Sequence, residues 1–211
     1  MSYRREYLRR AKLAAKVLRF VPHIKMAALN GSLVRGEEKK ASDIDFLIIA
    51  RTGRLYTARF FATMLVHLTG YRRYANKVAG RICLNCYLND KKPDISPKDK
   101  RSNQKVANAY KYLIALVDSG AIEEKFFKTN RWFARYKVSG EKYSNKLREK
   151  EFGDYPLSPF PLLDWFFASS IGDLVEKGLM KYQQKRIARG KDGFDELVAT
   201  DREIRLHPRK K

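Results

Sequence analysis

The 211-residue sequence is poor in cysteine, in acidic residues and in long apolar runs. Two cysteines cannot build a disulfide framework, which excludes the class of small disulfide-stapled domains. Charged residues interrupt the longest apolar stretches, such as DWFFASSIGDLV, so none reaches the roughly 20 apolar residues of a membrane helix. The basic N-terminal segment mixes apolar and charged residues and lacks the apolar core of a secretory signal. We therefore expect a cytoplasmic protein without a membrane segment.

The charge is strongly unbalanced, with 45 lysines and arginines against 23 aspartates and glutamates and a formal net charge of +22. The excess is spread along the chain rather than confined to one tail. A surface this positive attracts polyanions, so the composition predicts a nucleotide or nucleic-acid partner such as RNA. The alternative is that the charge serves only to keep the protein soluble. The hydrophobic content of 44% is that of a folded globular protein.

The two cysteines, Cys83 and Cys86, form a C-x-x-C pattern inside the strand-like segment RICLNCYL. In a regular strand, residues three apart point to opposite faces, which does not suit a shared metal or a redox pair. We predict that both are small core residues. The three histidines show no spacing typical of metal ligands.

The first half of the chain alternates between helical and strand patterns. Leu8, Ala11, Ala15 and Leu18 recur at helical spacing, which predicts an amphipathic helix over residues 3–20 with a basic outer face. The other elements predicted in this half are strands at 25–31, 43–50 and 81–88 and a helix at 54–70.

The second half reads as mainly helical. Residues 89–103 are charged and contain prolines, so they predict a loop near a boundary between a domain at 1–96 and a helical region at 97–211. The predicted parts of that region are helices at 104–120 and 122–136, an irregular segment at 139–161, a long helix at 162–190 bent near Gly172 or Gly178, and a frayed basic end at 202–211.

Two carboxylates stand at the entrance of the predicted strand 43–50, within the segment LNGSLVRGEEKKASDIDFLII. Asp43 and Asp45 are two residues apart, so a strand would point both to one face, with their Cα atoms about 6–7 Å apart. Convergent carboxylates repel each other unless a cation lies between them, and hard oxygen ligands suit Mg²⁺ or Mn²⁺. The alternative is a solvated strand entrance in which Ser42 and Asp43 form a turn.

A Gly-Ser pair ends the preceding strand. Gly31 would let the backbone approach a phosphate closely, and Ser32 would add its hydroxyl and N–H groups if a helix begins there. Arg35, one turn later, would add positive charge. Together with Asp43 and Asp45, these residues predict a site for a metal and a nucleotide triphosphate.

The segment GSLVRGEEKKASDIDFLII resembles the signature of the DNA polymerase beta-type nucleotidyltransferase superfamily. The resemblance implies an α/β (α+β) fold with a mixed sheet and flanking helices, and transfer of a nucleoside monophosphate (NMP) from a nucleoside triphosphate (NTP) to a hydroxyl group. It also implies that Asp43 and Asp45 are catalytic and bind two metals, while Gly31 and Ser32 hold the triphosphate. Further segments, including FKTNRWFARY and RLHPR, are similar to an uncharacterised bacterial branch of nucleotidyltransferase domain proteins.

The sequence departs from that pattern in one respect. Active members of the superfamily carry a third carboxylate on a later strand, but the matching segment RICLNCYL has none. Asn85 is its polar residue, and an amide cannot act as a base; Asp90 and Asp94 would substitute only if the following loop folds back. The acceptor is therefore left open among RNA, a small molecule and a partner protein, the last as in antitoxin-like nucleotidyltransferases. A nucleic-acid- or nucleotide-binding protein without turnover is the alternative function.

Three other segments admit two interpretations each. The basic N-terminal helix would either contact a nucleic-acid backbone or form a solvated face. The segment RWFARYK would stack bases or bury its aromatic residues, with burial the expected outcome. In GYRRYANK, residues Arg72, Arg73 and Lys77 would face the triphosphate, an RNA substrate or solvent.

Overall fold

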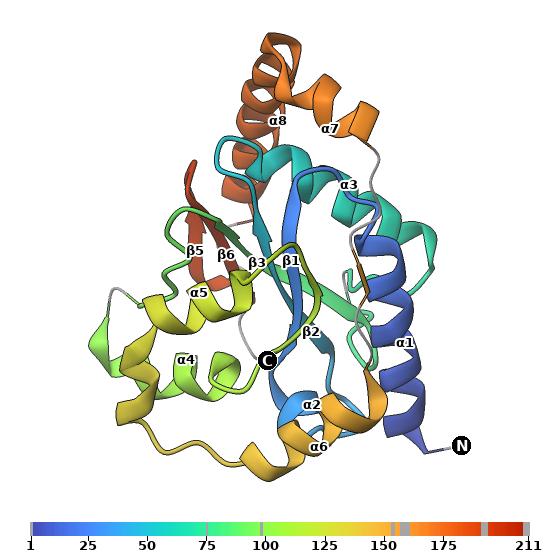
Figure 1. The fold of residues 1–211 in the computed structure, drawn as a ribbon, viewed down its shortest axis with the longest axis vertical. Helices are drawn as coiled ribbons and strands as arrows, with labels where there is room; N and C mark the ends of the chain where they lie inside the picture. The colour runs from blue at the N-terminus through green and yellow to red at the C-terminus, as the bar shows by residue number, and fades with distance from the viewer. Residues whose placement is uncertain are drawn as a thin grey trace.

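The computed structural model describes residues 2–74, 76–97, 99–152, 155–156, 161–190 and 194–208. Its centre is a six-stranded sheet with the strand order β4-β1-β2-β3-β6-β5 (Figure 1). The strands are β1 (Ile24–Asn30), β2 (Ile44–Ala50), β3 (Ile82–Asn89), β4 (Ile114–Asp118), β5 (Phe194–Ala199) and β6 (Glu203–Pro208). β2 and β3 are parallel and the other neighbouring pairs are antiparallel, which confirms the predicted mixed sheet.

Helices flank the sheet on both sides, with α1 and α3 on one side and α4 and α5 on the other (Figure 1). The α-helices are α1 (Tyr3–Leu18), α2 (Ser32–Arg35), α3 (Leu55–Leu68), α4 (Asn103–Tyr110), α5 (Ile122–Thr129), α6 (Glu141–Glu151), α7 (Pro161–Ala168) and α8 (Ser170–Arg189). Two short 3₁₀ helices, η1 (Lys100–Ser102) and η2 (Arg131–Arg135), accompany α4 and α5.

The sheet separates two apolar clusters, and β2 contributes to both. Phe46 and Ile48 pack with the side chains of α1 and α3, whereas Leu47 and Ile49 pack with those of α4, α5 and η2. Because both faces are covered, β2 reads as a continuous apolar run instead of an alternating one. The register of its entrance, where Asp45 lies, is therefore fixed by the core that follows it.

Hydrogen bonds from polar side chains of α8 hold this helix against α3. The Glu176 carboxylate accepts hydrogen bonds from the backbone N–H groups of Tyr56 and Thr57, at 2.9 and 2.8 Å, which satisfies donors at the start of α3. Further along α8, Gln183 donates to the Tyr56 carbonyl at 3.0 Å and accepts from Arg59 Nη1 at 2.5 Å. These bonds hold the basic C-terminal part of α8 against the outer side of α3.

Several predictions for the second half are wrong. The segment 104–120 contains only a short helix, because residues 114–118 form β4 and pair with β1. The segment 139–161 contains α6, and the end of the chain forms β6, which pairs with β3. The long helix is two helices that meet at Ser169 rather than one bent near Gly172 or Gly178.

The elements predicted for the first half are confirmed, as are the helical segment after residue 122 and the burial of Phe133 in the core. β4, β5 and β6 come from the region at 97–211, which therefore is not purely helical. The division into residues 1–96 and 97–211 stays a prediction. Within the described part of the chain, no helix combines the length and the apolar character needed to span a bilayer.

His23 lies between α1 and β1, and its buried imidazole makes the stability of the fold depend on pH. The residue is 5% exposed and has a positive φ of 63°. Burial lowers the pKa of its imidazole to about 4, although the nearby Asp164 carboxylate opposes this change. Since an exposed histidine has a pKa near 6.5, the unfolded chain takes up a proton between pH 6.5 and 4 that the folded chain does not.

Acidification from pH 6.5 to 4 is therefore expected to lower the free energy of unfolding by about 3 kcal/mol through His23 alone. The measurement is urea unfolding between pH 4 and 8, in the wild type and in His23→Asn. Asparagine tolerates a positive φ, so the variant removes the titrating group and keeps the backbone conformation. The stability difference between the two proteins should change with pH in this window; a constant difference would contradict the prediction.

Candidate active site

Pairing between β1 and β2 brings the Gly-Ser pair and the two carboxylates together. The strands are antiparallel, with Asn30 opposite Asp45, so the end of β1 and the start of β2 lie at the same end of the sheet. Gly31 follows β1 with a φ of 79° and a ψ of −151°, a backbone conformation that is available essentially only to glycine. A Cβ atom at this position would lie 2.8 Å from Asp45 Oδ2. The Asp45 carboxylate is thus packed directly against the glycine backbone.

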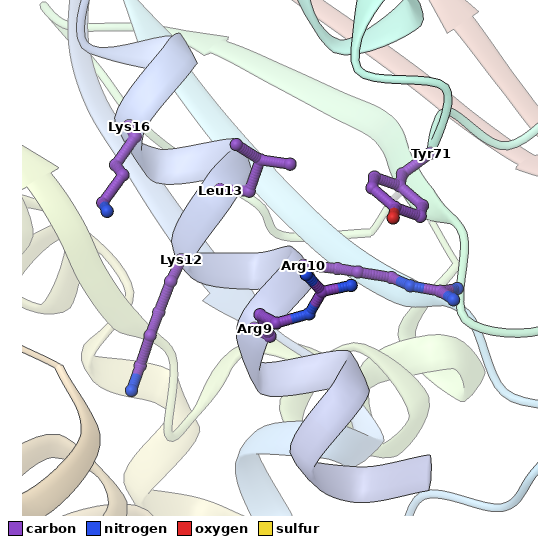
Figure 2. Close-up of a pocket in the computed structure, with 6 residues that line it drawn as sticks. All are labelled: Arg9, Arg10, Lys12, Leu13, Lys16 and Tyr71. Carbon is purple, nitrogen blue, oxygen red and sulfur yellow. The ribbon is translucent and has the colours of Figure 1, made fainter. Parts of the chain in front are cut away.

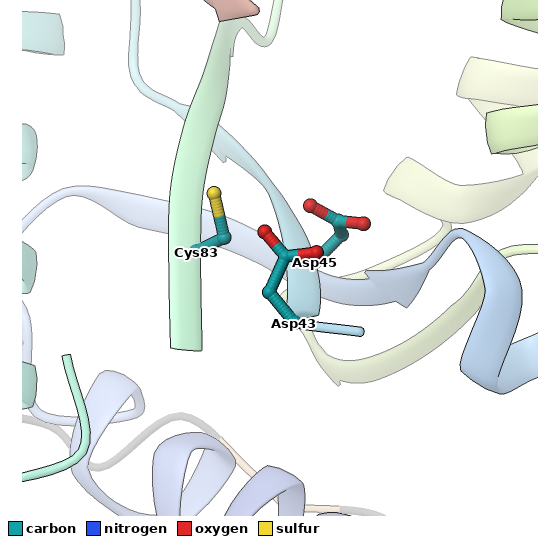
Figure 3. A group of neighbouring side chains, drawn as sticks. All are labelled: Asp43, Asp45 and Cys83. Atoms are coloured by element: carbon teal, nitrogen blue, oxygen red, sulfur yellow. The ribbon is translucent and has the colours of Figure 1, made fainter. Parts of the chain in front are cut away.

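Asp43, Asp45 and Cys83 form a compact group of potential ligands (Figure 3). Each offers one ligand atom, and these atoms all lie within 4.8 Å of one another. Cys83 joins the group because β3 is parallel to β2 and Cys83 is the register partner of Asp45. Both aspartates are partly exposed and Cys83 is buried, so a ligand could reach the two carboxylates from solvent.

The expected opposite orientation of Cys83 and Cys86 is wrong. The register shifts between the two strands, since Asp45 pairs with Cys83 and Leu47 with Cys86, which leaves one extra residue in β3. This bulge places both cysteines on the face of the sheet that bears Asp45 and Leu47. Both are buried and neither forms a disulfide, and Cys86 belongs to the apolar cluster beneath α4 and α5.

The donor set fits a hard divalent cation through its oxygen atoms. Two carboxylates suit Mg²⁺ or Mn²⁺, which retain water and phosphate oxygens in their remaining positions. Burial raises the pKa of the Cys83 thiol well above its usual value, and the charges of Asp45 and Asp43 raise it further. A soft, protonated sulfur is a poor ligand for such ions. Asp43 and Asp45 are therefore suitable ligands for such an ion, whereas Cys83 lines the site without acting as a ligand.

Arg73 balances part of the negative charge at the site. Its Nη1 atom lies 2.5 Å from Asp43 Oδ2 and donates to Cys83 Sγ at 3.5 Å. Backbone pairing positions it, because the Arg73 N–H donates to the Ile82 carbonyl at 2.8 Å beside the start of β3. Burial alone would lower the pKa of Arg73, but Cys83 and Asp43 outweigh this and raise it. Of the three cations singled out in GYRRYANK, this one faces the carboxylates, whereas Lys77 is exposed and lies over Tyr74.

The other predicted phosphate ligands have different surroundings. Ser32 begins α2 directly after Gly31, which meets the condition set for its proposed contact to phosphate, and it is partly exposed. That contact stays a prediction. The Arg35 guanidinium is bound to the Glu37 carboxylate, at 2.6 Å for the closest atoms, and to the Asn108 carbonyl. A role of Arg35 toward a triphosphate would require it to leave Glu37, so this role stays a prediction.

Asn30 is a site residue that sequence reasoning missed. It is 3% exposed and lies opposite Asp45, and its Oδ1 atom is buried without a hydrogen-bond partner among the described residues. A buried unpaired amide oxygen is costly in a folded protein and often marks a functional position. The signal was available, since Asn30 is the polar end of the run KMAALN and shares a face with Met26 and Ala28.

No carboxylate within β3 joins Asp43 and Asp45. Asp90 follows the opposite end of β3, where its carboxylate accepts hydrogen bonds from the N–H and hydroxyl groups of Thr52. Asp94 binds the Ser96 N–H beyond it. Because β2 and β3 are parallel, Asp90 lies at the far end of the sheet from Asp43, so the suggestion that it replaces the third carboxylate is wrong. The Asp94 carboxylate does not belong to the group of ligand atoms that Asp43 and Asp45 form with Cys83. Asn85 lies in the bulged part of β3, and its Oδ1 atom is buried without a partner among the described residues.

The basic face of α1 forms an open groove of about 260 Å³ (Figure 2). Its lining residues are Arg9, Arg10, Lys12, Leu13, Lys16 and Tyr71. Several of these charges are already compensated, since Glu6 binds both Arg9 and Arg10 at 2.8 Å and Glu151 binds Lys12 at 2.9 Å. Arg10 also lies over the Tyr71 ring at 4.6 Å. The groove is cationic, but acids within the same protein reduce its net charge.

Comparison with known proteins gives one finding. A model of the nucleotidyltransferase domain family matches residues 10–116, which extend from α1 to β4 and include the carboxylates, Gly31 and Arg73. Searches of curated proteins and of solved structures returned no match.

Proposed function

Since the chain belongs to the nucleotidyltransferase domain family, we propose that it transfers an NMP group from an NTP to a hydroxyl acceptor with the help of a divalent metal. The family generally uses an NTP and a divalent metal. The observation that carries the proposal is the convergence of Asp43 and Asp45 beside Gly31, where the Asp45 carboxylate occupies the space that a side chain would need.

Each residue has a defined part in this proposal. Asp43 and Asp45 hold the divalent ion, while Gly31 and Ser32 present backbone and hydroxyl groups to the triphosphate. When bound, such an ion neutralises the phosphates and stabilises the attacking and leaving oxygens of an in-line displacement. Arg73, which pairs with Asp43 in the structure, would give up this pair when the ion binds, and its guanidinium would then be available to a phosphate oxygen.

The proposed transfer needs no reagent other than the NTP and the acceptor. The acceptor hydroxyl oxygen forms a bond to the α-phosphorus, the bond from that phosphorus to the bridging oxygen breaks, and pyrophosphate leaves. The hydroxyl proton passes to solvent or to a phosphate oxygen, since the Cys83 thiol is already protonated and cannot accept it.

A second candidate is nucleotide binding without turnover. It is favoured by one observation, namely that Cys83 and not a carboxylate lies beside Asp45 on the neighbouring strand. A base is normally worth about 10²–10⁴ in rate, so turnover would be slow rather than impossible without it.

The decisive experiment is calorimetric titration of each NTP into the wild-type protein, with Mg²⁺ and with a chelator in place of the metal. Binding that requires Mg²⁺ supports a nucleotide site, and binding of no NTP would refute the proposal. Incubation with α-labelled NTP and candidate acceptors then separates the two functions. Label transferred with release of pyrophosphate supports the enzyme, whereas tight binding with no transfer to RNA, protein or small hydroxyl compounds favours the binding protein.

A further inference from the structure

Three arginines from distant parts of the sequence gather on the side of the sheet that α3 covers. Arg59 belongs to α3, Arg186 to α8, and Arg72 to the extended segment before β3. Arg59 and Arg186 come together because Gln183 fastens α8 to α3, and Gln183 itself accepts a hydrogen bond from Arg59. Arg72 is positioned by a parallel bridge to Ile82. We call Arg59, Arg72 and Arg186 the arginine cluster.

Within the described part of the chain no carboxylate compensates the charges of the arginine cluster, although Arg59 lies over the Tyr87 ring at 5.8 Å. None of its members forms an ion pair with a described carboxylate, and the Arg59 Nε atom is buried without a hydrogen-bond partner there. Burial lowers the pKa of Arg72, and the charge of Arg186 lowers it further. Burial likewise lowers the pKa of Arg59, with the charges of Arg72 and Arg186 acting in the same direction. Partly buried like charges destabilise a protein unless an anion binds among them.

Arg186 also belongs to an open groove of about 370 Å³ on α8. The groove is lined by Tyr182, Lys185, Arg186 and Arg189, whose positions i, i+3, i+4 and i+7 lie on one face of the helix. The Tyr182 side chain is 61% exposed beside these cations. An exposed aromatic ring within a basic groove is the arrangement on which single-stranded nucleic acids stack their bases and place their phosphates.

The segment Tyr71–Arg73 links the arginine cluster to the carboxylates. Successive side chains of an extended segment point to opposite sides. Accordingly, Arg73 binds Asp43, while Arg72 lies close enough to Arg186 for their charges to interact. Tyr71, at the other end of the segment, lines the groove of α1. The segment therefore has Arg73 beside the carboxylates on one side and the arginine cluster on the other, an arrangement that suits a ligand with several phosphates along a backbone better than a single phosphate.

We infer that the arginine cluster binds backbone phosphates of a single-stranded polynucleotide, whose hydroxyl group is the acceptor of the proposed transfer. The inference rests on the proposed function, because it names the acceptor for the same site. It extends that function to a surface made by α3, α8 and the segment before β3.

The test is fluorescence anisotropy with a labelled single-stranded RNA of 12 nucleotides and the DNA of the same sequence, at several salt concentrations. The variants are Arg186→Gln and Arg72→Gln/Arg186→Gln, and the control is Arg131→Gln/Arg135→Gln. The control removes the same charge from exposed arginines of η2. Arg186 is exposed, so its single variant keeps the test valid if the double variant folds poorly.

The double variant is expected to bind the oligonucleotide at least about tenfold more weakly. The slope of log affinity against log salt concentration should become shallower by about one for each phosphate that the variant no longer neutralises. The control should change affinity less than about twofold. Equal weakening in the cluster and control variants would overturn the inference, as would displacement of the oligonucleotide by an equal concentration of inorganic phosphate or pyrophosphate.

Mg²⁺-dependent NTP binding is measured separately by calorimetry, so that the inference and the proposed function can fail independently. The inference requires NTP binding to survive in the cluster variants. Absence of NTP binding in the wild type would refute the proposed function itself.

Discussion

The double variant Asp43→Asn/Asp45→Asn is expected to bind NTPs no more tightly with Mg²⁺ than with a chelator. Asparagine preserves the size of both side chains but removes two negative charges and replaces each carboxylate by a neutral amide, whose single oxygen is a much weaker ligand for a divalent ion. Even changes outside the first ligand shell of a metal cost about 10–100-fold in affinity, so loss of both ligands should exceed about 100-fold. Calorimetry with each Mg²⁺–NTP pair measures the effect.

Two further measurements make this prediction specific. Asp201→Asn changes an exposed aspartate to the same amide away from the carboxylates and should leave NTP binding unchanged. Direct titration with Mn²⁺ in the absence of nucleotide should give binding in the wild type and in Asp201→Asn but not in the double variant. Wild-type affinity for the Mg²⁺–NTP pair in the double variant would show that the carboxylates do not hold the ion.

The local part of this site was readable from the sequence because it depends on short-range geometry. The two-residue spacing of Asp43 and Asp45 fixes their common face in any strand, and the apolar run that follows fixes the strand. The Gly-Ser pair lies only one turn and a short loop away. These relations involve neighbours along the chain, so periodicity and residue type are sufficient to predict them.

The other parts depend on pairing between distant segments. Arg73 reaches Asp43 only because its backbone pairs with Ile82, and Cys83 reaches Asp45 through the same strand. The bulge that brings Cys83 and Cys86 to one face of the sheet cannot be recognised from the alternation of residues in the sequence of β3. β4 was misread as helix because five residues between polar segments fit either structure until the edge of β1 is available to pair with them.

The substitution Gly31→Ala is expected to disrupt the fold locally and the site with it. A Cβ atom would lie 2.8 Å from Asp45 Oδ2, and the φ of 79° is already unfavourable for alanine. The backbone strain costs about 1–3 kcal/mol, and the steric collision adds about 1–2 kcal/mol because the carboxylate must move. Urea unfolding should therefore report a loss of about 3 kcal/mol. Since disturbing the surroundings of a metal ligand costs about 10–100-fold in metal affinity, Mg²⁺-dependent NTP affinity should fall at least about tenfold.

Gly53→Ala is the matched control, because Gly53 has a φ of 77° and a Cβ atom added there would have no neighbouring atom within 4 Å. It should cost only the backbone strain and leave NTP binding intact.

A double-mutant cycle then isolates the steric collision between the new Cβ atom at position 31 and the Asp45 carboxylate. In an Asp45→Ala background the nearest remaining Asp45 atom would be its Cβ at 3.5 Å, an ordinary contact. Gly31→Ala should therefore cost about 1–2 kcal/mol less in that background than in the wild type. If Gly31→Ala were equally destabilising with and without the Asp45 carboxylate, the backbone conformation alone would account for the glycine. The close packing of Asp45 on Gly31 would then have no part in positioning the carboxylate.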